Sequence, residues 1–257
     1  MLTLIHQETF KLLRKKSTYF ATILLAGLMI LFAVLAKLHP KYFSPVGMFN
    51  NNFSGTLWIT FLMIAACGAI VAMEFQYGTV KELLYRKYNR GQVLMSKWLV
   101  MFAYSLYLYI LAFVLTIILK VSLFNNTFAF SKIGAGGHTL IENVGITMSG
   151  QFIGLWLILS LVLLLATMFK SATVAVSVGF IGYFASSVIA NLMFTLIAKW
   201  EWLKWNPINM LSLTDQITDS TYKTFTRLST DQLLLGNVGY VIVFLFLGYL
   251  IFRKRNV

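Results

Sequence analysis

The feature that most constrains this chain is a series of six apolar runs, each long enough to cross a lipid bilayer. A helix rises about 1.5 Å per residue, so about 20 residues span a hydrocarbon core of about 30 Å. The runs predict transmembrane helices at residues 19–38, 57–74, 97–119, 150–169, 172–198 and 233–252. Hydrophobic residues make up 59% of the 257 positions and charged residues only 11%, which is more apolar surface than a soluble domain buries. We therefore expect an all-α membrane protein with a single transmembrane domain, residues 1–257.

Residues 1–17 precede the first run and predict an interfacial elbow helix. Apolar residues gather near one helical face and charged residues gather towards the other. The apolar face comprises Leu2, Ile5, Leu12 and Leu13, and the charged face comprises Glu8, Lys11 and Lys15. A helix of this kind lies in the plane of the membrane interface. A basic cluster before an apolar run is also typical of a secretory signal, but the run that follows here is too long for one.

The stretch at residues 74–97, EFQYGTVKELLYRKYNRGQVLMSK, is densely charged and lies between the second and third runs. Gly78 can end the incoming helix, and Thr79 with Glu82 forms a capping box that starts a new one. Gly91 is the expected stop of this short helix. The pattern predicts an amphipathic helix lying flat on the membrane. The alternative is a solvated loop whose basic residues only fix orientation.

The sequence lacks the motifs of metal binding, nucleotide binding and intramembrane catalysis. The histidines His6, His39 and His138 are scattered and Cys67 is the only cysteine, so no metal site is expected. No phosphate-binding G-x-x-x-x-G-K-[ST] motif occurs, so any ATP must be bound by another polypeptide and no cofactor is expected in this chain. The centres of the six runs contain no Asp, Glu or His, which argues against intramembrane catalysis.

Small and polar residues mark two of the runs. The second run carries Gly68 among alanines at three- and four-residue spacing, which either lets another helix approach closely or reflects simple tolerance of small residues. The fifth run contains Ser186, Ser187 and Asn191, whose polar groups should not face lipid. We expect these three residues to face another helix or a substrate path.

The basic residues predict the orientation in the membrane. The net charge of +13 would suggest nucleic acid in a soluble chain, but here it raises the question of which side the charges occupy, and no nucleic-acid partner is expected. Thirteen of the 21 Lys and Arg residues lie on the side of the N-terminus and eight on the other side. The positive-inside rule therefore places both termini and residues 76–92 in the cytoplasm.

These features together resemble a known family. An acidic residue, Glu74, ends the second span, Gly78 and Thr79 follow, then comes a basic and apolar helix, and Lys97 opens the third span. This arrangement resembles the permeases of ABC-2 type exporters, and the similarity extends over the whole chain as a six-span layout. Many members of that family have a proline in this loop, and this sequence has none.

The resemblance implies a bacterial cell-membrane transport subunit that is not itself an enzyme. Two permease copies, identical or different, would pair in the bilayer, and each would engage a cytoplasmic ATPase subunit that holds ATP and Mg²⁺. The coupling residues carried over from the resemblance are Glu74, Gly78, Thr79, Lys81, Glu82, Leu83, Tyr85 and Arg86.

The resemblance leaves the substrate open between two classes. The candidate path lacks acidic and basic groups in the membrane, so a strongly charged sugar or nucleotide would lose much hydration free energy there. An amphipathic peptide or peptide antibiotic would lose less, because its apolar face can enter the bilayer first. The alternatives are export of a lipid or polysaccharide carrier, or a scaffold or sensor that transports nothing.

Overall fold

A computed structural model of the chain describes residues 1–76, 88–134, 137–169 and 171–254. Within these residues six helices are long and apolar enough to cross a membrane, which confirms the expected all-α class and the number of spans. They are α2 (Lys16–Leu38), α4 (Gly55–Gln76), α6 (Arg90–Phe124), α7 (Leu140–Met168), α8 (Ala172–Lys199) and α12 (Thr230–Lys254).

Two of the long helices, α6 and α7, begin seven and ten residues before the predicted apolar runs, because polar caps extend them. At the start of α7 the hydroxyl of Thr139 accepts from the backbone N–H of Glu142 at 3.4 Å, and the Glu142 carboxylate accepts from the Thr139 N–H at 2.8 Å. This reciprocal pair is a capping box, which satisfies free backbone donors at a helix start. At the start of α6 the Asn89 N–H donates to Gln92 Oε1 at 3.3 Å.

The expectation that Gly91 ends a helix is wrong. Gly91 lies in the first turn of α6, where a Cβ atom would come within 2.6 Å of Cε2 of Tyr249 on α12. The glycine is needed here because a neighbouring ring occupies the space of a side chain, rather than because the backbone turns.

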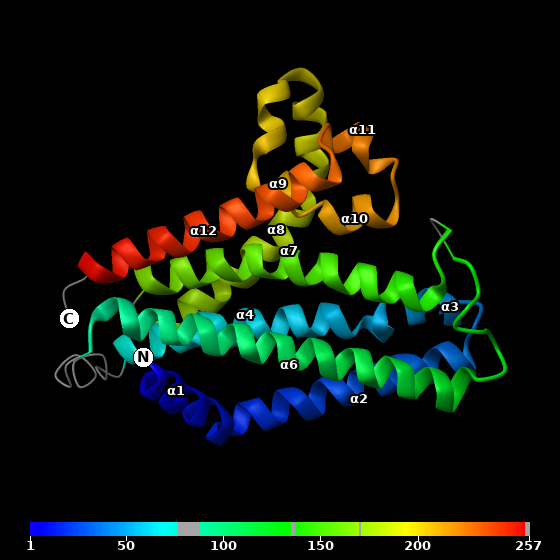
Figure 1. Cartoon of the computed structure of the whole chain (residues 1–257), viewed down its shortest axis with the longest axis horizontal. Coiled ribbons are helices and arrows are strands. Elements are labelled where there is room, and N and C mark those ends of the chain that lie inside the picture. Colours follow the sequence, from blue (N-terminus) through cyan, green and yellow to red (C-terminus); the bar gives the residue numbers. More distant parts are fainter. Residues whose placement is uncertain (77–87, 135–136, 170, 255–257) are drawn as a thin grey trace.

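The helices α4 and α7 form the centre of the bundle. In Figure 1 the long helices α2, α4, α6 and α7 run roughly along one direction, and α12 crosses beside α7. The helix α4 contacts α2, α6, α7 and α8, and α12 packs mainly on α7. The buried core therefore joins α2, α4, α6 and α7.

The small residues of α4 allow α8 to approach closely within the same chain. A Cβ atom on Gly68 would lie 3.1 Å from both the backbone N and the Cα of Val176 on α8. A Cβ atom on Gly179 would lie 2.9 Å from Cγ2 of Ile64 on α4. These contacts show that Gly68 and Gly179 line an interface between two helices of one chain.

The first and the last described residues, Met1 and Lys254, lie at one end of the bundle, which we call the proximal end (Figure 1). It contains α1 (Leu2–Arg14), the start of α6 and the end of α12 (Figure 1). The Arg90 Nη1 group donates to the carbonyl oxygen of Arg253 at 3.0 Å, and the Ala172 N–H donates to Gln76 Oε1 at 3.3 Å. The starts of α6 and α8 therefore lie beside the ends of α12 and α4.

Residues 200–229 form a layer of short helices that packs against α7, α8 and α12, and we call this layer the distal cap. Its elements are η3 (Glu201–Trp205), α9 (Pro207–Met210), α10 (Leu213–Thr218) and α11 (Tyr222–Thr226). The amide of Gln216 donates to the carbonyl oxygen of Leu228 at 3.1 Å and accepts from Thr226 Oγ1 at 2.6 Å. Asn237 of α12 donates to the carbonyl oxygen of Met210 at 2.7 Å, so buried amides fix the cap on the bundle. Two further short elements, α3 (Pro45–Asn50) and η1 (Asn52–Ser54), connect α2 to α4.

Candidate functional site

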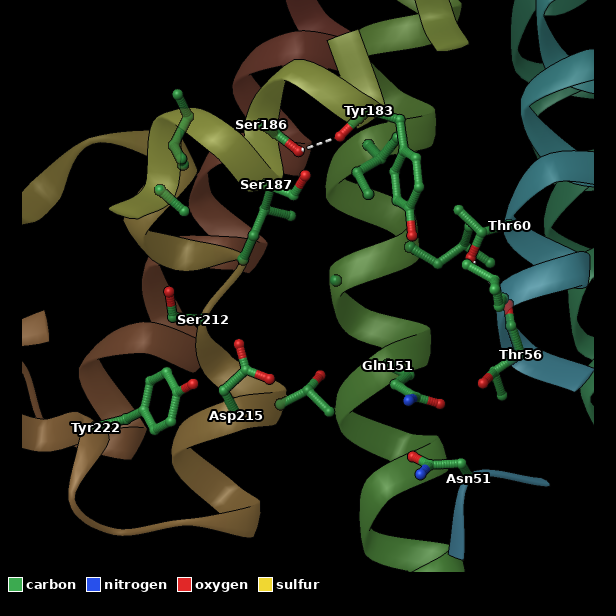
Figure 2. Close-up of a pocket in the computed structure, with 18 of the residues that line it drawn as sticks. Asn51, Thr56, Thr60, Gln151, Tyr183, Ser186, Ser187, Ser212, Asp215 and Tyr222 are labelled. Carbon is green, nitrogen blue, oxygen red and sulfur yellow. Dashed lines mark hydrogen bonds between the residues drawn. The ribbon is translucent and has the colours of Figure 1, made fainter. Parts of the chain in front are cut away.

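A cavity of about 600 Å³ lies between α4, α7, α8 and the distal cap. We call it the polar cavity. Figure 2 shows hydroxyl, amide and carboxylate groups from these elements directed towards a shared space. Its polar lining residues are Asn51, Ser54, Thr56, Thr60, Gln151, Tyr183, Ser186, Ser187, Asn191, Ser212, Thr214, Asp215 and Tyr222.

The three residues predicted to face a helix or a substrate path all line the polar cavity. Ser187 and Asn191 share one face of α8 because they are four positions apart, and Ser186 lies at the edge of that face, one position before Ser187. Their donors are engaged within α8: Ser186 donates to the carbonyl oxygen of Tyr183 at 2.7 Å, and Ser187 donates to that of Phe184 at 2.8 Å. The serine hydroxyl oxygens can still accept hydrogen bonds from a molecule in the cavity.

Sequence reasoning missed the polar residues that face α8 from α4 and α7. Thr56 and Thr60 lie one turn apart on α4, and Gln151 lies on α7. The oxygen Oε1 of Gln151 is buried and has no hydrogen-bond partner among the described residues. Part of the signal was present in the sequence, because Thr60 and Gln151 interrupt apolar runs at positions where a lipid-facing helix would be uniformly apolar, whereas Thr56 lies just before its run.

One charged side chain, Asp215 of α10, lines the polar cavity among the described residues. Although the residue is exposed at one edge, neighbouring atoms displace water from its carboxylate and raise its pKa above the ordinary value of 3.8. Leu57, Leu155 and Phe194 supply an apolar wall. The cavity therefore offers hydrogen-bonding groups, one acid and hydrocarbon surface to a molecule that enters it.

A second group of functional interest lies at the proximal end, and we call it the charged cluster. The ammonium of Lys97 on α6 lies 2.8 Å from Oε2 of Glu8 on α1 and 2.7 Å from Oε1 of Glu74 on α4. Lys11 lies 2.7 Å from Oε1 of Glu8 and 3.5 Å from Oε1 of Glu74. The side chain of Lys97 is only 1% exposed. Two ammonium and two carboxylate groups thus join three helices, and their charges cancel.

The charged cluster shows that Glu8, which was expected on the charged face of an interfacial helix, is buried against the bundle. Glu8 is only 4% exposed and α1 packs against α6, while Leu2 is 83% exposed. The buried ammonium of Lys97 requires anionic partners, and Glu8 supplies one. Burial by itself would raise the pKa of Glu8, but the ammonium groups of Lys97 and Lys11 outweigh it and hold that pKa below 4.5. The two carboxylates likewise raise the pKa of Lys11 above 10.5, against the effect of burial.

Among the predicted coupling residues the structure describes Glu74, which is buried and paired with Lys97 rather than free at the surface. The others lie outside the described residues. They are Gly78, Thr79, Lys81, Glu82, Leu83, Tyr85 and Arg86.

Comparison with known proteins gives one family and two relatives. Residues 41–257 match the family described as "Protein of unknown function (DUF2705)". The "Uncharacterized membrane protein YdbK" of Bacillus subtilis is 27% identical over 260 aligned residues, covering 96% of this chain and 99% of YdbK. The "Uncharacterized protein YhcI" of the same organism is 28% identical over 77% of this chain, and the match spans 64% of YhcI. The six apolar helices and these relatives make the protein a multi-pass membrane protein, and the family match shows that the chain belongs to the DUF2705 family.

Proposed function

We propose that this chain is the membrane subunit of an ABC-2 type exporter, driven by ATP that a separate cytoplasmic subunit hydrolyses. The observation that carries the proposal is the charged cluster, since Glu74 opens and Lys97 closes the stretch that resembles the coupling element. The 2.7 Å ion pair between these two residues anchors both ends of that stretch to the bundle. A force applied to it by a partner would therefore reach α4 and α6, and through Glu8 also α1.

The charge distribution supports the orientation that this function needs. Thirteen of the 21 Lys and Arg residues, but only three of the eight Asp and Glu residues, lie in segments that flank or join the helices on the N-terminal side. The positive-inside rule then assigns the proximal end to the cytoplasm of a bacterial cell. In this orientation the stretch at residues 74–97 faces the compartment that contains ATP, and α1 is the interfacial elbow helix.

The polar cavity supports an amphipathic substrate, and we propose a membrane-active peptide. Its serine and amide groups can pair with peptide bonds, while Leu57, Leu155 and Phe194 can contact apolar side chains. The two substrate-binding faces would come from two permease copies paired in the bilayer, as in other exporters that this stretch resembles.

Affinity purification of the tagged full-length chain in a mild detergent tests the partner. We expect an ABC ATPase to co-purify and Arg86→Glu to weaken that association. Lys254→Glu is the matched control, because it makes the same charge change on an exposed residue at the proximal end. Glu74→Lys is unsuitable, since it would place a third ammonium beside Lys97 and Lys11 and disrupt the bundle itself. Recovery of the intact chain without any ATPase would favour a scaffold or sensor.

Peptide sensitivity tests the substrate. Deletion and complemented strains are compared on amphipathic helical peptides, bacitracin-like peptides and lantibiotics, and ATPase stimulation of the reconstituted complex is measured alongside. We expect the deletion strain to be more sensitive to at least one peptide class, and that class to stimulate ATP hydrolysis. Unchanged sensitivity together with stimulation by a lipid-linked sugar would replace the peptide by a polysaccharide carrier.

A further inference from the structure

A second cavity, of about 980 Å³, lies between α1, α2 and α4, and we call it the lateral groove. It is distinct from the polar cavity, which α7, α8 and the distal cap line on the other side of α4. Residues of α6, among them Met101 and Tyr104, also line the lateral groove. The groove begins at the charged cluster and continues along the apolar face of α4, and only the first turns of α2 line it, through Ser17, Thr18, Phe20 and Ala21.

The length of the apolar wall matches one leaflet of a bilayer. Along α4 the lining residues run from Leu62 to Glu74. Twelve residue steps at about 1.5 Å each give about 18 Å, which is slightly more than half of a hydrocarbon core of about 30 Å. Leu62, Ala66 and Ile70 line this length from α4, and Phe20 and Ala21 face it from α2. An extended acyl chain fits such a wall, because the chain is apolar throughout its length.

The charges of the groove are confined to its proximal end and have a positive surplus. Glu8 and Glu74 are compensated by Lys97 and Lys11, so these four groups contribute no net charge. Lys15 also lines the groove, is exposed, and contacts Sδ of Met73 at 3.8 Å rather than a carboxylate. An anionic headgroup at this position would pair with Lys15 and with the exposed side of Lys11.

A headgroup with hydroxyl donors would also supply a hydrogen bond to a buried acceptor, the Oε2 atom of Glu74. This oxygen has no hydrogen-bond partner among the described residues. A buried acceptor without a donor is unfavourable, and a glycerol hydroxyl supplies a donor. The combination of a cation at the rim, a carboxylate oxygen beside it and a leaflet-deep apolar wall favours a glycerol-bearing anionic phospholipid over a peptide or a neutral lipid.

We propose that the lateral groove binds one anionic phospholipid of the phosphatidylglycerol type. One acyl chain lies along α4 and α2, the phosphate pairs with Lys15 and Lys11, and the glycerol hydroxyls reach Glu74. Such a lipid would fill the space between α1 and the bundle. This site shares no lining residue with the polar cavity and does not depend on the exporter proposal.

Native mass spectrometry of the full-length chain, delipidated and then titrated with phosphatidylglycerol or phosphatidylcholine, tests the site. We expect one phosphatidylglycerol to be retained and phosphatidylcholine to be lost. Lys15→Glu should weaken retention roughly tenfold or more, because it reverses one charge at the headgroup. Lys16→Glu is the matched control: it makes the same change at the next residue, which does not line the groove.

A second variant blocks the apolar wall without changing charge. Ala66→Phe places a ring in the groove and should abolish retention, and Val188→Phe on an exposed face of α8 is its control. If Ala66→Phe does not fold, the Lys15→Glu and Lys16→Glu pair still decides the outcome, since both positions are exposed. Equal retention of phosphatidylcholine, equal weakening by Lys15→Glu and Lys16→Glu, or equal binding of soluble glycerol 3-phosphate would each overturn the proposal.

Discussion

Lys97 is unusual among lysines, because its ammonium group is almost fully buried in an apolar bundle. Burying an ammonium group costs several kcal/mol unless anionic partners compensate it. Glu8 and Glu74 do so at 2.8 and 2.7 Å, from positions 89 and 23 residues away in the sequence. The packing of α1 on α6 therefore brings two buried carboxylates to this ammonium. Removing it leaves them with Lys11 as their only counterion among the described residues.

Replacing Lys97 by methionine should destabilise the protein by about 3–5 kcal/mol, because the two buried carboxylates are then left to share one exposed counterion, Lys11. Thermal unfolding in detergent micelles, followed by near-UV circular dichroism, measures the loss. Lys16→Met removes an exposed lysine and should change little. The triple variant Glu8→Gln, Glu74→Gln, Lys97→Met should recover part of the loss, since no charge is then buried. A loss below about 1 kcal/mol for Lys97→Met would mean that the cluster contributes as little as a surface ion pair.

The docking of α1 should resist mild acid and mild base. The pKa of Glu8 lies below 4.5 in the folded state, so its contribution is complete above the ordinary carboxyl pKa and is lost as the pH falls through the lowered value. The pKa of Lys11 lies above 10.5, so its contribution persists until the pH rises beyond that value. We expect α1 to stay docked from about pH 5 to about pH 10 and to release in stronger acid.

Spin labels at Leu13 on α1 and Met95 on α6 measure this docking as a distance distribution, in a Cys67→Ala background. Both positions are exposed, so the labels do not disturb the core. A control pair at Leu57 and Leu99 reports on α4 and α6 within the bundle. Broadening of the first distribution between pH 5 and 7 would contradict the assigned role of Glu8, and broadening of both would indicate general unfolding.

Among the elements, α4 and α8 show how glycine determines the distance between two helices. The backbone of α8 at Val176 lies so close to Gly68 that a methyl group has no room. Backbone atoms cannot move aside as a side chain can, so the whole helix must shift when this glycine is replaced. The contact matters for the polar cavity, because α4 and α8 form two of its walls.

Gly68→Ala should therefore destabilise the bundle by about 1–3 kcal/mol, a typical cost of overpacking. Gly27→Ala on α2 is a matched control, since a Cβ atom there meets nothing within 4 Å. That control should be neutral or stabilise the helix by up to about 1 kcal/mol, because alanine has the higher helix propensity. Thermal unfolding in the same detergent compares the two variants. Equal effects at both positions would mean that α8 moves away from α4 at no cost.

The elements also show what the sequence can and cannot predict. Apolar length alone identified the six spanning helices, because only a helix can cross a bilayer in such runs. The early start of α7 was readable from Thr139 and Glu142, which fit the capping-box pattern. The contact between the ring of Tyr249 and Gly91 could not be predicted, since Tyr249 comes from a helix far along the chain.

For the whole molecule, the two candidate sites differ in how far the sequence predicted them. Ser186, Ser187 and Asn191 were identified because polar groups in an apolar run need partners, and they line the polar cavity. Asp215 was not predicted to join them, because its position depends on the folding of the distal cap around Gln216. The charged cluster was missed for a similar reason: helical periodicity places Glu8 on a polar face but does not reveal that Lys97 lies against that face.

The arrangement of the ends of the molecule leads to a prediction about its orientation in the membrane. The six apolar helices place their two ends on opposite sides of the membrane. An impermeant thiol reagent added to intact cells therefore reaches only residues on the outer side. Single cysteines at Asn51 and Thr221, in a Cys67→Ala background, should label, because both positions are exposed beside α4 and in the distal cap. Cysteines at Lys254 and at Tyr85 should label only after the cells are permeabilised, because the excess of Lys and Arg places their side in the cytoplasm. The reverse pattern would put the proximal end outside, where no ATPase could reach the stretch between α4 and α6, and the exporter proposal would then be wrong.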